Sequence, residues 1–363
     1  MPHHPMLSGD RFRLGTFSTN CSSGMTPTKV PERWVNSWDN NLKLAQMLDE
    51  AGIDFMLPIA RWIGYGGETD FHGGVLETMT WAAGLLAATK NIAVFATIHT
   101  AANHPVVVAK QMATIDHISH GRAGLNIVAG WNKPEYEALG LTLPDDHETR
   151  YGYAQEWFDL VRKLWSSDEH FDWDGTYFKA KRVKGDPKPL RGSVPIINAA
   201  GSPQGREFAT DNANFLFTPA IDLDRSKGEI ADLKAQAKAK GRDVNVLTFS
   251  HVICRPTEAE AKAYADYTAV QNADTEAVDN LVRLQFAHAH SFPHDLLAQI
   301  KHLFALGHGG FPLIGTPDQV AEGILKLHAT GFAGTTLSFV DYVEEFPYFR
   351  DTVLPKLAAA GIR

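Results

Sequence analysis

A polar amide interrupts one of the most apolar stretches of the chain. Asn126 lies in the run Ala123–Val128 (AGLNIV), which is otherwise apolar and has the length of a buried strand. In a closed parallel barrel, alternate side chains of a strand point inward. A buried amide without a hydrogen-bond partner costs on the order of 1–3 kcal/mol. A bound heterocycle could provide that partner, and so could a polar group of a neighbouring loop, so both interpretations stay open.

A second candidate site begins at Gly201. Ser202 and Pro203 follow it, between an apolar run and a segment with helical periodicity. Free backbone N–H groups and the helix dipole make a helix N-terminus an anion site, to which a serine adds a hydroxyl donor. A serine followed by proline is also a common way to begin a helix without any ligand. The pattern therefore predicts either a phosphate site or an ordinary helix cap.

These residues need a scaffold, and the chain alternates β-rich apolar runs with helical segments. Strands that are buried on both faces and joined by helices form a parallel sheet. Eight such units favour a closed (β/α)8 TIM barrel over a doubly wound sheet, and we expect residues 1–363 to form a single barrel domain. The eight expected strands are Phe12–Phe17, Phe55–Pro58, Ile92–Thr97, Ala123–Val128, Ile196–Ala199, Phe215–Thr218, Val244–Cys254 and Thr335–Phe339.

Two segments do not fit this repeating unit, and we expect them to be insertions on βα loops. Residues 166–195 contain FDWDGTYFK, in which an Asp-Gly pair between aromatic residues is typical of a hairpin. Residues 270–314 have the glycines and aromatic residues of a mobile lid, although a rigid packed insert is equally compatible with them. The residues in question are Phe286, His288, Phe292 and Gly307–Gly310.

Composition excludes several classes of protein. The 34 Lys plus Arg residues against 42 Asp plus Glu give a formal charge of −8 without a basic block, so nucleic acid or an anionic membrane is not an expected partner. Cys21 and Cys254 are too few for a disulfide framework or a Cys-based zinc site. No apolar run approaches the roughly 18 residues of a membrane span, and the first residues lack the order of a signal peptide. The composition predicts a cytoplasmic enzyme.

The histidines invite a metal interpretation that their spacing does not support. His288, His290 and His294 form the densest group, but no carboxylate stands at a register typical of zinc or iron sites. A built-in dinucleotide fold is not indicated either, because no GxGxxG run follows a strand. We therefore expect no metal ion and no nucleotide-binding domain within the chain.

The stretch from Thr114 to Leu141, with its Gly130-Trp131 corner and the following Lys-Pro-Glu-Tyr, resembles the luciferase-like flavin monooxygenases. The most similar branch is the pyrimidine oxygenases of uracil breakdown, and the dimethyl-sulfone and alkanesulfonate monooxygenases are similar more loosely. Further similar segments cover nearly the whole chain in the same order. They are Gly64–Phe71, Leu86–Thr97, Ala113–Arg122, His147–Trp157, Asn198–Ala209 and Leu313–Ile324.

The resemblance implies that FMN occupies the mouth at the carboxyl ends of the barrel strands. Asn126 would face the flavin ring, and Thr97 beside it would complete an oxygen pocket. His99, just past the third strand, is expected to be a substrate contact or proton donor, or otherwise a surface or core histidine. The flavin contacts implied by the resemblance are Ile59, Ala60, Asn126, Glu135, Arg150, Tyr151, Gly201 and Ser202.

By the same resemblance, the chain would use reduced FMN and O2 to oxygenate a small polar substrate. An N-heterocycle or cyclic amide, opened as in the pyrimidine oxygenases, is expected first, and a sulfone or alkanesulfonate second. A sulfonate would need a cationic clamp, for which Arg61 and Arg283 are the candidates. Reduced FMN would come from a separate NAD(P)H:flavin reductase, and a homodimer or homotetramer is expected. A deazaflavin-dependent hydride transferase and a non-catalytic flavin-binding protein are the alternatives.

Overall fold

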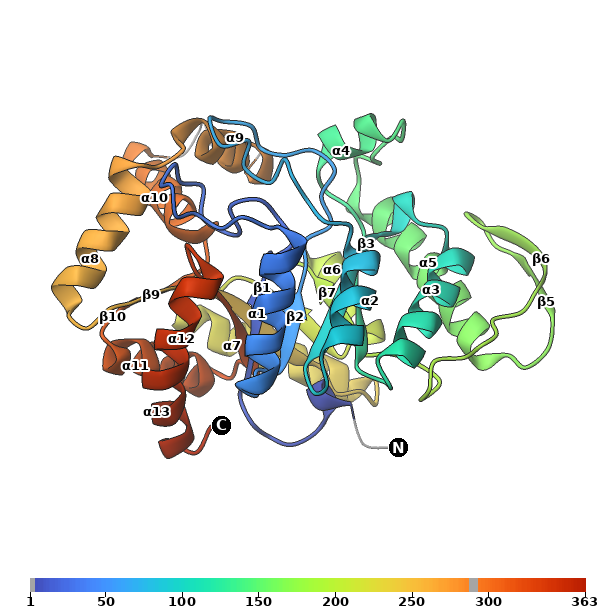
Figure 1. Ribbon diagram of the computed structural model, residues 1–363. Coiled ribbons are helices and arrows are strands. Elements are labelled where there is room, and N and C mark those ends of the chain that lie inside the picture. The colour runs from blue at the N-terminus through green and yellow to red at the C-terminus, as the bar shows by residue number, and fades with distance from the viewer. Residues whose placement is uncertain (1–3, 287–292) are drawn as a thin grey trace.

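The computed structural model describes residues 4–286 and 293–363, and at its centre is a closed parallel β-barrel (Figure 1). Within these residues eight strands pair side by side in chain order, and the last pairs with the first to close the barrel. The closed eight-stranded barrel confirms the (β/α)8 fold class. The barrel strands are β1 (Arg13–Phe17), β2 (Phe55–Leu57), β3 (Ala93–His99), β4 (Ala123–Val128), β7 (Ile196–Ala199), β8 (Phe215–Phe217), β9 (Asn245–Cys254) and β11 (Gly334–Ser338).

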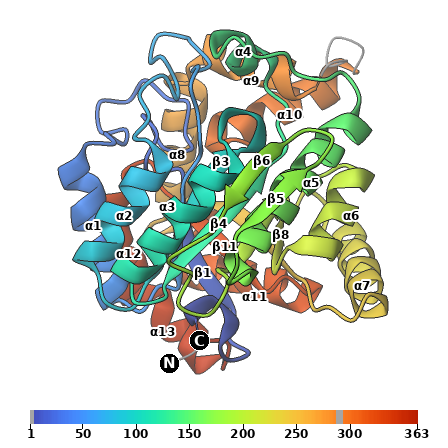
Figure 2. The ribbon, with the colours of Figure 1, turned by 90° about the vertical axis from the view of Figure 1, so that its right-hand side faces the viewer.

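Helices surround the barrel because each carries one apolar stripe that the outer faces of the strands bury (Figure 2). In the longest of them, Trp157, Leu160, Val161 and Leu164 follow the helical repeat and are all buried. The helices of this layer are α1 (Trp38–Glu50), α2 (Thr78–Ala88), α3 (Pro105–Ile118), α5 (His147–Ser166), α6 (Pro203–Asn212), α7 (Leu223–Ala239), α11 (Pro317–Thr330), α12 (Tyr342–Thr352) and α13 (Leu354–Ala359).

The barrel interior is filled by aromatic side chains, so it is a packed core rather than a pore. Phe55 and Phe95 meet edge to face inside it, and Gly124 leaves the space that the Phe95 ring occupies. Because successive side chains of a strand alternate between faces, the residue two positions after Phe95 also points inward, as does the residue two positions after Gly124. These are Thr97 and Asn126, one layer nearer the carboxyl ends of the strands.

The two segments that do not fit the repeating unit have different structures. Within residues 166–195, β5 (Phe171–Asp174) and β6 (Lys179–Val183) form an antiparallel hairpin that projects from the barrel (Figure 1). The hairpin follows α5 and precedes β7, so the prediction that this segment is an insertion on a βα loop is wrong: it lies on an αβ connection. Residues 270–314 contain α9 (Thr275–Gln285) and α10 (His294–Gly307), which follow α8 (Glu258–Asp266).

A further strand, β10 (Phe311–Gly315), begins at the end of residues 270–314, and the sequence analysis did not anticipate it. It pairs in parallel with the last residues of β9, beyond the residues that pair with β8 and partly overlapping those that pair with β11. The strand therefore lengthens one wall of the mouth and is not part of the closed barrel.

Helices α9 and α10 pack against the loop after β2 through a second apolar cluster. That cluster includes Tyr65 and Phe71 from the loop, Leu281 from α9 and Phe304 from α10. The described part of the segment is thus packed onto the mouth, whereas His288 and Phe292 lie outside the described residues. Among the described residues, no helix is long and apolar enough to cross a membrane.

Candidate active site

Thr97 and Asn126 lie opposite each other at the carboxyl ends of adjacent strands. They are partners in the β3–β4 register, and Nδ2 of Asn126 donates to Oγ1 of Thr97 at 3.2 Å. The Thr97 hydroxyl in turn donates to the Pro58 carbonyl at 2.7 Å. This chain of donors leaves Oδ1 of Asn126 buried without a hydrogen-bond partner. A buried acceptor without a partner on the inner face of the mouth fits a ligand that carries an N–H group.

A buried acidic side chain lies beside His99, two residues after Thr97 in the chain. Glu135, from the short helix α4 (Lys133–Ala138), accepts a hydrogen bond from the Trp62 backbone N–H at 2.9 Å. The same Oε1 lies 3.3 Å from Nη1 of Arg61, and Oε2 lies 3.8 Å from Nδ1 of His99. Glu135 therefore holds three segments together at the mouth and balances the charge of Arg61.

His99 is neutral at physiological pH. Burial, reinforced by the positive charge of Arg61, lowers the pKa of His99 to about 4. A neutral imidazole can donate or accept a hydrogen bond, but it does not deliver a proton as an imidazolium would. The structure thus brings His99 to the site in the form that suits a binding contact.

The loop after β2 forms the other wall. Both backbone groups of Ile59 are occupied by the Asn20 side chain, at 3.0 Å for the N–H and 2.8 Å for the carbonyl. The Ile59 N–H is therefore not free to bind a ligand, and its half-buried side chain is available for contact. Ala60 lines a cavity of about 390 Å³. That cavity is also lined by Arg61, Trp62, Thr97 and His99.

The N-terminus of α6 is built as a compact polar corner. The hydroxyl of Ser202 accepts from the Gly205 N–H at 3.2 Å, which caps the helix. Tyr151 of α5 interacts with Ser202, and burial raises the pKa of the Tyr151 hydroxyl. A side chain at position 205 would collide with Tyr151, whereas no atom lies within 4 Å of the position that a Cβ of Gly201 would occupy. The corner is therefore closed by Tyr151 and open toward Gly201.

Arg150 does not join this corner through its hydrogen bonds. Its Nη1 donates to the carbonyl of Pro144 at 2.6 Å and to that of Asp145 at 3.3 Å, both in the loop that precedes α5. The side chain is half-buried. Arg150 therefore ties down the connection between α4 and α5, next to the corner that Tyr151 completes.

Three histidines that the sequence analysis did not assign also lie buried at the mouth. His72 and His308 stack with ring centroids 5.7 Å apart, and burial lowers the pKa of His308 to about 3. His251, near the carboxyl end of β9, has a pKa lowered to about 3 for the same reason, and its Nε2 has no partner. No local sequence pattern marked them, because they come from three distant segments of the chain.

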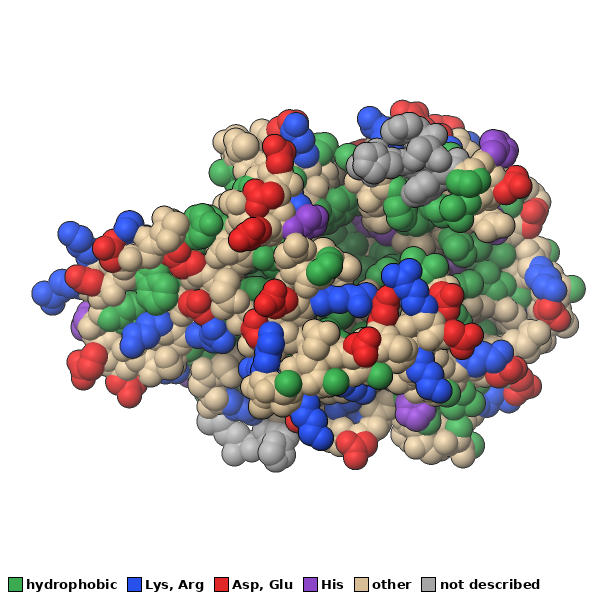
Figure 3. All heavy atoms as spheres, turned by 180° about the vertical axis from the view of Figure 1, so that it is seen from behind, with side chains coloured by type: hydrophobic (Ala, Val, Ile, Leu, Met, Phe, Trp, Pro, Cys, Tyr) green, Lys and Arg blue, Asp and Glu red, His purple; other side chains and the backbone are tan. Residues whose placement is uncertain are grey.

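The mouth is visible as a recess between the projection formed by α4 and the region of α9 and α10 (Figure 3). Hydrophobic and histidine side chains line it. No three His, Cys, Asp or Glu side chains gather into a metal-binding group within residues 4–286 and 293–363. Of the histidine group singled out in the sequence, His288 and His290 lie outside the described residues, and His294 is exposed.

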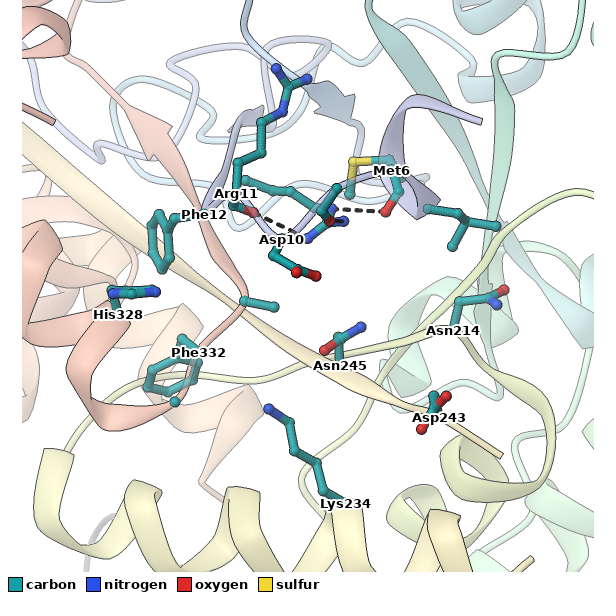
Figure 4. Close-up of a pocket in the computed structure, with 15 residues that line it drawn as sticks. Met6, Asp10, Arg11, Phe12, Asn214, Lys234, Asp243, Asn245, His328 and Phe332 are labelled. Carbon is teal, nitrogen blue, oxygen red and sulfur yellow. Dashed lines mark hydrogen bonds between the residues drawn. The ribbon is translucent and has the colours of Figure 1, made fainter. Parts of the chain in front are cut away.

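A second hollow, of about 500 Å³, lies at the opposite end of the barrel (Figure 4). Its lining includes Asp10, Lys234 and Asn245, and Arg13 there is used to bind the carbonyls of Met6 and other residues of the N-terminal segment. In (β/α)8 barrels the amino-terminal face supports stability and the carboxyl-terminal face carries chemistry. The candidate active site is therefore the mouth that contains Thr97 and Asn126.

Known proteins are similar to this chain over nearly its whole length. The family model described as luciferase-like monooxygenase matches residues 12–334. The chain is 32% identical over 355 residues to the FMNH(2)-dependent dimethylsulfone monooxygenase of Pseudomonas fluorescens (strain Pf0-1), with 96% of this chain and 95% of that protein covered. It is 30% identical over 354 residues to the pyrimidine monooxygenase RutA of Acinetobacter baylyi, with the same coverage of 96% and 95%.

Solved structures show the same fold. The crystal structure of DmoA from Hyphomicrobium sulfonivorans superposes with a TM-score of 0.87 at 18% sequence identity, covering 97% of this chain and 89% of that one. These matches confirm the resemblance found in the sequence, and the chain belongs to the luciferase-like monooxygenase family.

Proposed function

We propose that the protein is a two-component monooxygenase that uses reduced FMN and O2 to oxygenate a small, neutral, polar substrate. The observation that carries the proposal is the pair of uncharged side chains, Thr97 and Asn126, at the carboxyl ends of β3 and β4, with an unpartnered amide oxygen. A relative that matches nearly the whole chain is named for its dependence on FMNH(2).

The residues of the mouth fit FMN. Asn126 would bind the polar edge of the flavin ring through its free Oδ1, and Ala60 and Glu135 would be further flavin contacts. Gly201, Ser202 and the first N–H groups of α6 would bind the phosphate. When bound, FMN supplies the reducing electrons and the activation of O2.

The protein's own contribution is to bind, orient and exclude water. The second N–H of the Asn126 amide can donate a hydrogen bond to developing negative charge, and the Thr97 hydroxyl can do so after it turns away from the Pro58 carbonyl. Neither group is acidic enough to transfer a proton quickly. The aromatic core beneath them closes the mouth against water from below. His99, being neutral, adds a polar contact without adding charge to the site.

Charge balance points to the class of substrate. Arg61 is already paired with Glu135, and Arg283 is exposed and donates to Asn280 at 3.2 Å. Neither of these two arginines is thus an uncompensated clamp for a sulfonate. We therefore propose an N-heterocycle or cyclic amide, with ring opening as the outcome, and a neutral sulfone as the second candidate.

The remaining elements of the proposal concern the assembly. A separate NAD(P)H:flavin reductase would supply reduced FMN, as the wording FMNH(2)-dependent in the relative's name suggests. Residues 1–363 would form one domain that assembles as a homodimer or homotetramer in the cytoplasm. Size-exclusion chromatography with light scattering measures that assembly directly.

Oxygen uptake tests the function. With NADH, FMN, catalase and an added flavin reductase, we expect uracil or dimethyl sulfone to increase the O2 consumed per NADH, because catalase returns half of the O2 that uncoupled FMN oxidation turns into hydrogen peroxide, and to yield an oxygenated product by mass spectrometry. Methanesulfonate serves as the anionic control and is expected to have no effect. Turnover that needs a deazaflavin and consumes no O2 would identify a hydride transferase, and absence of any substrate-dependent uptake would favour a flavin-binding protein.

Replacing Ser202 with alanine tests the phosphate corner. The variant is expected to bind FMN about 10-fold or more weakly, because a hydrogen bond to a charged group is lost. Binding of riboflavin, which lacks the phosphate, is expected to change little. Fluorescence quenching of each flavin on titration with the protein measures both. Ser202→Thr keeps the hydroxyl and is the matched control; an equal loss for FMN and riboflavin would exclude a phosphate contact at Ser202.

A further inference from the structure

Arg61 has hydrogen-bond donors that nothing in the described protein uses. Its side chain is 5% exposed, and both Nε and Nη1 are buried without a hydrogen-bond acceptor. Nη1 lies 3.3 Å from Oε1 of Glu135, an ion-pair distance without hydrogen-bond alignment. Burying a charged group with unsatisfied donors is unfavourable. Arg61 is therefore expected to have an acceptor that is not part of the protein.

The guanidinium is held in one place. It lies over the ring of Tyr65, 4.7 Å from the centroid, and 5.5 Å from the centroid of the Trp131 ring. Glu135 is itself fixed by the N–H of Trp62. Stacking and ion pairing together restrict the rotamers of the arginine, so its unused donors keep a constant direction.

Tyr65 is positioned by the insertion that covers the mouth. Nδ2 of Asn280, on α9, donates to the Tyr65 carbonyl at 2.9 Å. The Tyr65 side chain is buried, its hydroxyl has no hydrogen-bond partner, and burial raises its pKa to about 12. A second protonated donor without an acceptor thus lies in the residue that Arg61 covers.

Arg61 also shares a cavity with the candidate catalytic residues. The cavity of about 390 Å³ that Thr97 and His99 line is lined by Arg61 as well. A small molecule that enters this cavity to reach Thr97 therefore comes within reach of the guanidinium.

We propose that Arg61 determines substrate choice by donating hydrogen bonds to an oxygen of a neutral substrate, a carbonyl of a cyclic amide or an oxygen of a sulfone. The proposal rests on the proposed function and adds to it the residue that recognises the substrate. A neutral acceptor is favoured because Glu135 already balances the arginine, so an anion would bring an uncompensated charge into a buried site.

The test compares binding of substrate probes with binding of the cofactor. Uracil, dimethyl sulfone and methanesulfonate are titrated by calorimetry into the protein loaded with oxidised FMN, and FMN affinity is measured separately by fluorescence. Arg61→Met removes the donors, and Arg61→Met combined with Glu135→Gln does so without leaving a buried unpaired carboxylate. Glu135→Gln alone accounts for the effect of the second change. Arg283→Met, on the exposed face of α9, is the matched control.

We expect both Arg61→Met variants to bind the neutral probe that the wild type prefers about 10- to 100-fold more weakly, which corresponds to loss of charged hydrogen bonds. The FMN affinity of Arg61→Met should differ from that of the wild type by less than about 3-fold. The FMN affinity of the double variant should differ from that of Glu135→Gln by less than about 3-fold. Arg61→Lys should recover part of the binding, and Arg283→Met should match the wild type.

Four results would overturn the inference. Probe binding could be unchanged in the variants, or FMN affinity could fall equally, which would assign Arg61 to the flavin. The wild type could also bind methanesulfonate best, or bind none of the three probes. Failure of the proposed function is distinguishable. In that case a neutral probe binds in an Arg61-dependent way, but no probe increases O2 consumption.

Discussion

Replacing Asn126 with alanine is expected to lower the rate of substrate oxygenation about 100- to 1000-fold, the range found when one preorganised donor is removed from an active site. The change removes both the donor to Thr97 and the buried oxygen that has no partner in the protein. Reduction of free FMN by the partner reductase should be unaffected, because that step does not involve this chain. Product formation per NADH oxidised measures the difference.

Matched variants separate the role of the amide from its effect on folding. Asn198 is another buried amide, but it lies on the outer face of β7 and donates to the Ile127 carbonyl at 2.9 Å. Asn198→Ala should lower stability without lowering oxygenation per folded molecule. Thr97→Val, which keeps the shape and removes the hydroxyl, should reproduce the loss seen for Asn126→Ala, and Thr97→Ser should not. Normal turnover by Asn126→Ala would refute the assignment.

Acid is expected to destabilise the fold steeply below pH 6.5. Burial lowers the pKa values of His4 and His99 to about 4 and of His251 and His308 to about 3, from the usual 6.5, and that of His72 well below it. Above pH 6.5 these residues are neutral in both states. Between pH 6.5 and 4 the unfolded chain binds protons that the folded chain excludes, so stability falls as the pH falls.

The size of the acid effect follows from the number of buried histidines. Each contributes about 1.4 kcal/mol per pH unit within that window. Several acting together would exhaust a stability of about 5–15 kcal/mol before pH 4 is reached. Urea unfolding followed by circular dichroism at pH 7.5, 6.5, 5.5 and 5.0 measures the slope.

A pair of variants tests the cause of this pH dependence. His251→Gln removes one buried titrating group. It should reduce the slope of the free energy of unfolding against pH by the contribution of one histidine. His294 is 97% exposed, so His294→Gln should leave the slope unchanged. If the two variants show the same slope as the wild type, buried histidines do not cause the acid sensitivity.

The barrel could be predicted because its strands are buried on both faces. Such strands leave continuous apolar runs, and eight of them, separated by helical segments, match the eight barrel strands of the structure. Strand β10 was missed because it lies beyond the closed barrel, where Phe311 and Pro312 are not fully buried and glycines surround it. Its pairing depends on the extension of β9, which no local pattern reveals.

By itself the sequence determined the fold class, the polar amide in the fourth strand and the serine that begins α6. The fold class follows from agreement with short periodic patterns, and the amide and the serine stand out as local departures from them. Only the tertiary structure decided which of these groups have partners. Trp62 and Glu135 are 73 residues apart in the chain, yet they meet at the mouth. There the buried Glu135 carboxylate balances the charge of Arg61. Asn20 occupies the backbone of Ile59 in the same way, 39 residues away. Hydrogen bonds and ion pairs between distant segments form only when the barrel closes, because closure is what brings the ends of its strands to one face.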